Sequence, residues 1–215
     1  MRPRIEIVVA IDGPAAAGKG TLARRLAAEL GLPYLDTGLL YRAVGRRVLD
    51  ARGDPFDPTQ AEAAARALLP GDLGRSDLRE PEADLVAAAV AAFPGVRQAL
   101  LDFQRNFAAE RGAVLDGRDI GTVVFPDARA KLFVTASLAA RALRRHAELK
   151  ARGINESLAS VEADMAARDA ADSARVSAPL RQAEDAVRLD TTDLSPDAAF
   201  VRALEIVRAR LQAED

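Results

Sequence analysis

The sequence predicts an α/β fold in which helices cover both faces of a mainly parallel, five-stranded sheet. Three observations lead to this prediction. Short apolar runs rich in β-branched residues alternate along the chain with segments of helical periodicity. Glycine and proline clusters separate these segments. A chain of 215 residues, 49% of them hydrophobic, is also long enough for one domain with a sizeable core.

The predicted strands are apolar along almost their whole length, which is typical of strands buried on both faces of a parallel sheet. They cover residues 5–11, 32–36, 113–116, 131–134 and 186–189. An aspartate stands at the end of three of them, as Asp12, Asp36 and Asp116. Because ligands of such folds bind beyond the carboxyl ends of the strands, these aspartates mark the expected site.

Between the strands, apolar residues recur at helical spacing. The predicted helices cover residues 19–30, 37–53, 59–69, 82–92, 95–111 and 137–150, a stretch marked by 158, 161 and 165, and a last segment from 196 to about 211. Gly31 stands where the first helix should stop, and Ser195-Pro196 forms an N-cap followed by an N1 proline. The helix that contains Met165 is expected to give way to a polar stretch before Pro179.

The composition excludes several kinds of site. The chain has no cysteine and only one histidine, which rules out disulfides, thiolate metal centres, a cysteine nucleophile and multi-histidine metal sites. A net charge of -2 argues against a protein that coats nucleic acid, so no nucleic-acid partner is expected. The first apolar run, residues 5–11, contains Glu6 and is too short for a membrane span or a signal peptide. We therefore expect a cytoplasmic protein without membrane contact.

A glycine-rich loop between the first strand and the first helix matches the phosphate-binding pattern G-x-x-x-x-G-K. Its residues, all expected to bind ATP, are Gly13, Pro14, Ala15, Ala16, Ala17, Gly18, Lys19, Gly20 and Thr21. The glycines let backbone N–H groups point at phosphate oxygens, and Lys19 supplies a cation to the β and γ phosphates. The hydroxyl comes at Thr21, one residue later than usual, so we expect it to reach Mg²⁺ directly or through a water. The alternative is a glycine turn beside a solvated lysine.

The loop alone predicts a nucleotide site that could serve a kinase, a GTPase, a motor or a sensor. No N-K-x-D segment of the kind that reads guanine is present. Three further motifs narrow the choice: residues 35–42, residues 116–127, and a run from Arg168-Asp169 through Asp172 and Arg175 to Pro179-Leu180. Together with the loop they resemble the bacterial cytidylate kinases, in order and spacing, across nearly the whole chain.

The resemblance implies a fold and an activity. The fold would be a P-loop kinase in a single domain over residues 1–215, with a region that binds the nucleoside monophosphate at about 37–111 and a helical lid at about 151–184. The activity would be transfer of the γ-phosphoryl group of ATP to CMP or dCMP, giving ADP and the diphosphate, with Mg²⁺ bridging phosphates. We expect a monomer.

The resemblance also assigns roles to individual residues. Lys19, Arg118 and Arg168 would be catalytic. The residues implied to bind CMP are Asp36, Thr37, Tyr41, Arg42, Arg97, Arg118, Asp119, Arg168, Asp172 and Arg175. Arginine suits this work because its planar fork binds phosphate in two places and stays charged. The Asp119 carboxylate can accept a hydrogen bond from the N4 amine of cytosine and would repel the carbonyl of uracil, with Arg97 as donor to the ring.

Simpler interpretations exist for single residues. The chain has 27 arginines, so any one of them taken alone would ordinarily be a solvated surface residue. Asp36-Thr37 can cap a helix, and Tyr41 can serve packing alone. The basic cluster from Arg141 to Lys150 is predicted to be a solvated helix face rather than a nucleic-acid patch.

Some positions depart from the family pattern. Residues 87–89 are alanines where relatives often have a serine that helps to hold cytosine, so base selectivity could be looser. The insert that many relatives fold as a small sheet is reduced to about residues 67–82, and Ala171 and Ser173 replace frequent arginines in the lid. The alternatives are a kinase for another small acceptor, such as UMP, dTMP or a sugar acid, and a regulatory module that binds ATP without transferring phosphate. The choice between CMP and dCMP stays open.

Overall fold

The computed structural model describes residues 7–212, without the side chains of residues 81 and 82. Its five-stranded sheet has the order β2-β3-β1-β4-β5. The strands are β1 (Val8–Asp12), β2 (Tyr34–Asp36), β3 (Ala113–Gly117), β4 (Ala130–Thr135) and β5 (Val187–Asp190). Strand β1 pairs in parallel with β3 and β4, and β4 pairs in parallel with β5, so the predicted parallel sheet is confirmed. Residues 5 and 6 of the first predicted strand lie outside the described part.

Helices occupy almost all the predicted positions. They are α1 (Lys19–Leu30), α2 (Thr37–Asp50), α3 (Pro58–Arg66), α4 (Pro81–Ala91), α5 (Pro94–Ala108), α6 (Leu138–Ala151), α7 (Leu158–Ala174) and α8 (Pro196–Gln212). Gly31 ends α1 with a left-handed φ of 65°, and the Ser195 hydroxyl accepts a hydrogen bond from the N–H of Ala198 at the start of α8. Helix α7 continues through the polar stretch to Ala174, further than its apolar spacing predicts, because it buries Asp172 in its last turn.

The chain divides into two compact units. One contains the residues up to Leu35 and from Arg111 onward, and the other contains residues 36–110. Within residues 7–212, no single helix is long and apolar enough to cross a membrane. Residues 83–91 and 94–108 pass that test of length and composition only as a pair, bent by 100° at the break between them.

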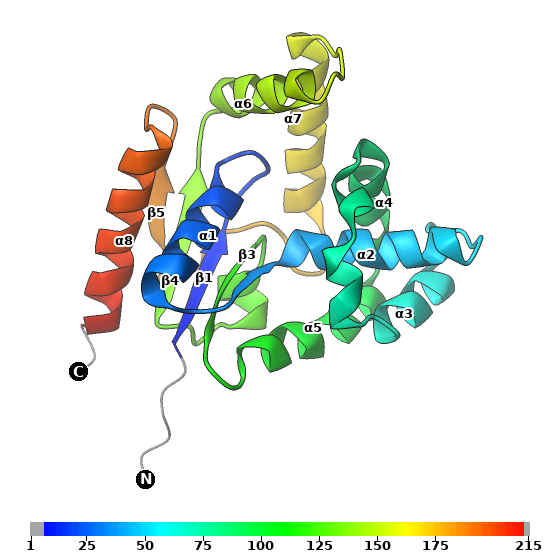
Figure 1. Ribbon diagram of the computed structural model, residues 1–215, viewed down its shortest axis with the longest axis horizontal. Helices are drawn as coiled ribbons and strands as arrows, with labels where there is room; N and C mark the ends of the chain where they lie inside the picture. The colour runs from blue at the N-terminus through cyan, green and yellow to red at the C-terminus, as the bar shows by residue number, and fades with distance from the viewer. Residues whose placement is uncertain (1–6, 213–215) are drawn as a thin grey trace. The chain divides into compact units, whose positions relative to one another are not determined.

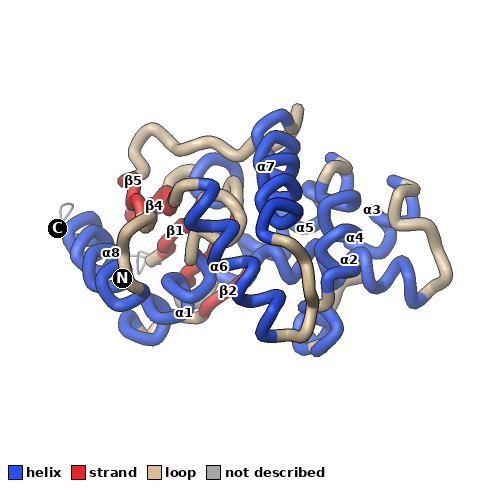
Figure 2. Tube along the Cα trace, turned by 90° about the horizontal axis from the view of Figure 1, so that it is seen from above, coloured by secondary structure: helices blue, strands red, loops and turns tan. Residues whose placement is uncertain are grey.

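The sheet and its adjoining helices form the core of the first unit. Helices α1 and α8 lie side by side and pack against the sheet (Figure 1). Leu26 of α1 and Val207 of α8 are completely buried there, together with Ile11 and Leu132 of the central strands. Helices α6 and α7 pack on each other (Figure 2), with Met165 in their shared apolar cluster. The loop after β1 is therefore anchored by a rigid strand on one side and a buried helix on the other.

The second unit is built from α2 to α5, with α2 packed on α4 and α3 packed on α5. Leu40, Val44 and Val48 of α2 are buried, which confirms the predicted apolar seam of this helix. Helices α2 and α4 approach each other closely at Gly45. A Cβ atom on Gly45 would lie 2.3 Å from Cγ1 of Val86, so the absence of a side chain is what permits this contact.

The shortened insert contains two short 3₁₀ turns, Pro70–Gly74 and Ser76–Arg79. Residues 67–80 hold no strand, in agreement with the prediction. The Asp72 carboxylate accepts a hydrogen bond from the N–H of Leu69 and forms an ion pair with Arg47 of α2, both at 2.9 Å. The ion pair therefore fastens the insert to α2, and Leu78 of the second turn adds a completely buried apolar side chain.

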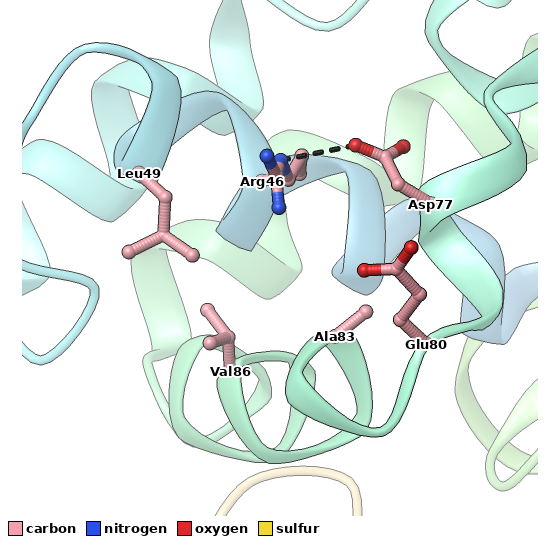
Figure 3. A pocket seen from close by; sticks show the side chains of 6 residues that line it. All are labelled: Arg46, Leu49, Asp77, Glu80, Ala83 and Val86. Carbon is pink, nitrogen blue, oxygen red and sulfur yellow. Dashed lines mark ion pairs between the residues drawn. The ribbon is translucent and has the colours of Figure 1, made fainter.

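A network of ion pairs lies beside these turns. Arg75 contacts Asp50 at 2.5 Å and Asp77 at 2.8 Å, and hydrogen bonds from its guanidinium are the main cause that holds the pKa of both carboxyls below the usual value. Figure 3 shows Arg46 reaching Asp77 across a small hollow of about 10 Å³. That volume holds about one water molecule, so the hollow is no nucleotide pocket.

Candidate functional site

The loop between β1 and α1 has backbone conformations that few sequences can adopt. Gly13 has a φ of 146°, and a Cβ atom there would lie 1.9 Å from the carbonyl oxygen of Val134. Gly18, with a φ of 89°, is the N-cap of α1. Ala16 is also left-handed, with a φ of 55°, a conformation that costs about 1–3 kcal/mol and that concentrates at functional sites. The first N–H groups of α1, which have no partner within the helix, thus follow a strained loop. Such N–H groups are the donors that a phosphate-binding site requires.

Lys19 belongs to this loop rather than to the solvent. Its side chain is buried, with 6% of the residue exposed, and Nζ donates a hydrogen bond to the carbonyl oxygen of Pro14 at 2.7 Å. The bond folds the ammonium group back over the loop, where a polyphosphate would lie. A solvated lysine, the alternative interpretation, is therefore wrong.

A carboxylate with a fixed orientation lies beside the start of α1. Asp116, in β3, accepts a hydrogen bond from the hydroxyl of Tyr34 at 2.9 Å. A Cβ atom on Gly20 would lie 3.8 Å from the Asp116 carboxylate and 3.5 Å from the Tyr34 hydroxyl, so both groups lie directly beside the first turn of α1. The sequence reasoning missed Tyr34, whose only signal was its position in the short second strand.

The oxygen donors near the loop suit one kind of metal ion. Thr21 is exposed in the first turn of α1, and Asp116 lies near its neighbour Gly20. In the part of the chain that the structure describes, no three acidic or histidine side chains gather into a metal-binding group. Such sparse protein ligands fit Mg²⁺, which keeps several waters and is held largely by substrate phosphates in kinase sites.

The segment after β3 is held by the end of β1. Asp119 is buried, and the chain then makes a single π-turn, Ile120–Val124, that the sequence did not predict. The carboxylate of Asp12 accepts hydrogen bonds from the N–H groups of Ile120 at 2.8 Å and Gly121 at 2.7 Å. Burial raises the pKa of Asp12 to about 6, although these two hydrogen bonds oppose the shift.

The candidate residues of the lid gather around one carboxylate. Asp172 of α7 is buried, and its Oδ2 accepts a hydrogen bond from Nε of Arg118 at 2.8 Å. Arg175, the first residue after α7, pairs with the same carboxylate. Burial alone would raise the pKa of Asp172, but the charges of Arg118, Arg175 and Arg168 hold it below the usual value. Four of the predicted residues are thus one electrostatic cluster.

Arg141 was predicted to lie on a solvated helix face, and that prediction is wrong. Its side chain is 6% exposed and makes three contacts from the start of α6. Nε donates to the carbonyl oxygen of Ala136 at 3.0 Å, one terminal nitrogen donates to that of Ala15 at 3.3 Å, and the other pairs with Asp169 at 2.6 Å. Arg141 therefore joins the phosphate loop to α7. Its signal in the sequence was the Arg168-Asp169 motif, in which the aspartate had no assigned partner.

The neighbouring Arg144 is not part of a free surface either. It donates hydrogen bonds to the hydroxyl of Thr191 at 3.1 Å and to the carbonyl oxygen of the same residue. The buried Thr191 hydroxyl in turn donates to the carbonyl oxygen of Ala17 in the loop at 3.1 Å. Within this cluster only Lys150, at the end of α6, agrees with the predicted exposure. The loop is therefore braced through two arginines of one helix.

The remaining predicted residues lie in the second unit. The guanidinium of Arg97, a buried residue of α5, lies 5.5 Å from the centre of the Tyr41 ring. Arg42 contacts Asp84 of α4 through Nε at 3.0 Å and through a terminal nitrogen at 2.8 Å. Asp36 is at the N-cap position of α2 but makes no capping hydrogen bond with its side chain. Its carboxylate is thus not explained by the capping interpretation.

The structure brings the predicted residues together in two groups. The loop, Arg118, Asp119 and the α7 cluster belong to the first unit, whereas Asp36, Thr37, Tyr41, Arg42 and Arg97 belong to the second. A hollow of about 290 Å³ in the second unit is lined by residues of α2 and α3 and by Ala51, none of which is a predicted site residue. Neither this hollow nor the one beside Arg46 therefore contributes to the site.

Comparisons with known proteins place these features in a family. The family model for cytidylate kinase matches residues 9–209. The chain is 63% identical to the cytidylate kinase of Acidiphilium cryptum over 94% of this chain and 95% of that protein, and 63% identical to that of Granulibacter bethesdensis over 96% and 99%. Among solved structures, a gluconokinase from Sinorhizobium meliloti has the same fold, with a TM-score of 0.51 at 14% identity over 97% of this chain and 94% of that one.

Proposed function

Because the chain belongs to the cytidylate kinase family, we propose that it transfers the γ-phosphoryl group of ATP to CMP and dCMP, with release of ADP. The bond between the γ-phosphorus and its bridging oxygen breaks as an oxygen of the acceptor phosphate bonds to that phosphorus. The observation that carries the proposal is similarity over nearly the whole chain, joined to a strained loop with a buried lysine.

The residues act mainly by position and charge. In direct phosphoryl transfer the protein itself forms no covalent bond with the substrates. Catalysis therefore depends on alignment of the two nucleotides and on cations that stabilise the negative charge on the phosphoryl oxygens. We assign Lys19 to the β and γ phosphates, and Arg118 and Arg168 to the transferred group. Asp172 supports this assignment because its ion pair holds Arg118 at the site until phosphate oxygens take the place of the carboxylate.

We infer that residues of the second unit bind the acceptor. Residues 36–110 correspond closely to the region expected to bind the monophosphate, at about 37–111. Arg42 would grip the phosphate of CMP, with Asp36, Thr37 and Tyr41 around the nucleotide. Helix α7 and the residues up to about 184 would serve as the lid that excludes water. Without a lid, water could replace the acceptor and hydrolyse ATP.

Mg²⁺ is the ion we expect to accompany ATP. When bound, it neutralises charge on the phosphate oxygens and so favours attack by another anion. Thr21 and Asp116 are the residues that would hold it, the hydroxyl directly or through a water. The contribution of the chain is to orient Asp116 through Tyr34.

Base recognition is the most specific part of the proposal. We assign it to Asp119, which would accept a hydrogen bond from the N4 amine of cytosine, and to Arg97, which would donate to the ring. Hydrogen bonds of this kind discriminate strongly, because the wrong base leaves polar groups unpaired. The Asp119→Asn variant should lower kcat/KM for CMP about tenfold or more, and the value for UMP far less. Equal losses for both nucleotides would remove base recognition from Asp119.

An assay of ADP release tests the proposal as a whole. The acceptors to compare are CMP, dCMP, UMP, AMP and dTMP, each against ATP alone. We expect CMP and dCMP to give the highest kcat/KM. Faster turnover with UMP or dTMP would support the alternative in which the enzyme phosphorylates another small acceptor. A sugar acid is the remaining acceptor to test for that alternative. If no acceptor raised turnover above ATP alone, the kinase proposal would fail and the regulatory ATP-binding module would replace it. A monomeric state and a cytoplasmic location remain predictions.

A further inference from the structure

The carboxylate of Asp12 is the buried acidic group that the proposed mechanism leaves without a task. It ends β1, directly before the phosphate loop, and only 5% of the residue is exposed. Burial of a carboxylate is expensive, and here it raises the pKa to about 6. A buried apolar residue would avoid that cost, so the contacts of Asp12 need a reason.

Both hydrogen bonds that Asp12 accepts come from the segment that follows Asp119. The donors, Ile120 N–H at 2.8 Å and Gly121 N–H at 2.7 Å, are the first two of the π-turn. N–H groups at the start of a helical turn have no partner inside it and need an acceptor. Asp12 supplies that acceptor from more than a hundred residues away in the sequence. It acts as a remote cap.

The cap fixes the backbone on one side of Asp119, and the sheet fixes the other. Strand β3 pairs with β1 so that Asp12 is opposite Gly117, two residues before Asp119. The space around the cap is tight, because a Cβ atom on Gly121 would lie 3.4 Å from Oδ2 of Asp12 and 3.1 Å from the side chain of Lys131. Asp119 is therefore held between two attachments to the same strand end.

We propose that Asp12 is a positioning residue for base recognition: by capping Ile120 and Gly121 it holds Asp119 in the orientation that distinguishes cytosine from uracil. The proposal rests on the assignment of base recognition to Asp119. It links the strand that begins the ATP loop to the segment that reads the acceptor, through one carboxylate.

The test is the Asp12→Asn variant, which has nearly the same shape. One amide oxygen can accept from only one of the two N–H groups, and the amide nitrogen then faces the other donor. We expect kcat/KM for CMP to fall about tenfold and the preference for CMP over UMP to shrink by a similar factor, while KM for ATP changes less than about threefold. Asp127→Asn, which changes an exposed carboxylate nearby, should leave all these values unchanged.

The outcomes separate the proposal from its alternatives. A merely structural Asp12 would lower the yield or the melting temperature, and would reduce the rates with CMP and UMP by the same factor. An unchanged preference in Asp12→Asn, beside a reduced preference in Asp119→Asn, would overturn the proposal. If Asp119→Asn itself kept the preference, base recognition by Asp119 would fail, and the role of Asp12 would fall with it.

A second variant covers the case in which Asp12→Asn does not fold. Gly121→Ala leaves Asp12 intact but crowds the N–H group that it caps, because the added methyl group would lie 3.1 Å from the side chain of Lys131 and 3.4 Å from Oδ2 of Asp12. The same reduction of the CMP to UMP preference is expected. A Gly121→Ala enzyme with the wild-type preference would contradict the proposal.

Discussion

Single side chains in this site are held by contacts that their sequence neighbours do not reveal. Lys19 is one of three lysines beside 27 arginines, and the structure buries it over the loop with a bond to Pro14. An ammonium group is a compact point charge, whereas a guanidinium needs room for its planar fork. The tight loop therefore explains why the chain places a lysine here.

The first prediction concerns that charge. Lys19→Met keeps most of the apolar stem but removes the ammonium group, so transfer should fall by about a thousandfold or more, because stabilisation of the transition state is lost. Circular dichroism and thermal unfolding should stay close to the wild type. Lys150→Met, at an exposed lysine of α6, is the matched control and should keep full activity. Substantial transfer by Lys19→Met would contradict the assignment of the loop.

A second prediction at this scale concerns Arg141. Because its side chain binds Ala15 of the loop and Asp169 of α7, Arg141→Met should leave the loop less ordered and raise KM for ATP about tenfold. Initial rates at varied ATP and fixed CMP give the value. Arg145→Met changes a neighbouring, more exposed arginine of α6 and should leave KM for ATP unchanged. Equal effects of the two variants would show that the contacts of Arg141 do not matter.

At the scale of elements, the spacing of apolar residues predicted the positions of most helices and strands. It did not predict where α7 ends or the π-turn after Asp119. The spacing of Leu40, Val44 and Val48 gave the buried face of α2 correctly, because burial along a helix follows its period. Helix α7 could not be given its full length, since its last turn buries the charged Asp172 through an ion pair with Arg118, 54 residues earlier in the chain. The π-turn after Asp119 was missed for the same reason, as its cap is Asp12.

The packing of α2 on α4 gives a third prediction. Gly45→Ala gains up to about 1 kcal/mol of helix propensity, but the new methyl group would overlap Val86 and cost about 1–3 kcal/mol. We therefore expect a net loss of stability, measured as a lower midpoint of urea unfolding. The double variant Gly45→Ala with Val86→Ala should recover part of the loss, whereas Gly74→Ala, with open space around it, should show no overlap penalty. A fully stable Gly45→Ala would mean that the two helices can separate freely.

For the whole molecule, the dependence of stability on pH combines shifts of opposite sign. Asp50, Asp77 and Asp172 have lowered pKa values, so their stabilising contributions are present above about pH 3.8 and are lost as the pH falls. Asp12 has a raised pKa of about 6. Its contribution is complete below about pH 3.8 and is lost as the pH rises through 6.

The fourth prediction follows from that sign. A rise of the pKa from 3.8 to about 6 corresponds to about 3 kcal/mol, most of it lost between pH 4.5 and 7.5. The free energy of unfolding of the wild type, relative to Asp12→Asn, should therefore decrease by about 2 kcal/mol over this range. Urea titrations at both pH values measure it, and Asp127→Asn serves as the control. A constant difference would show that Asp12 titrates in the folded protein as it does in water.

The site as a whole was only partly predictable from the sequence. The motifs gave the phosphate loop and placed Arg168, Asp172 and Arg175 close together, because short spacings determine which side chains share a turn. The pairing of Asp172 with Arg118 spans 54 residues and has no such local signal. Tyr34, Arg141 and Thr191 were missed because each contacts its partner across a large sequence separation, which no local pattern encodes.

The pairing of Asp172 with two arginines has a consequence for competing anions. A small ion such as sulfate or inorganic phosphate must displace a carboxylate that already pairs with both Arg118 and Arg175, and one such ion brings no further contacts in return. A nucleotide also brings its sugar and its base, which offset the exchange. We therefore expect weak inhibition by inorganic phosphate, and stronger inhibition in Asp172→Asn. The Asp172 carboxylate should pair with the two arginines again as the product leaves. This exchange weakens product binding and so favours turnover.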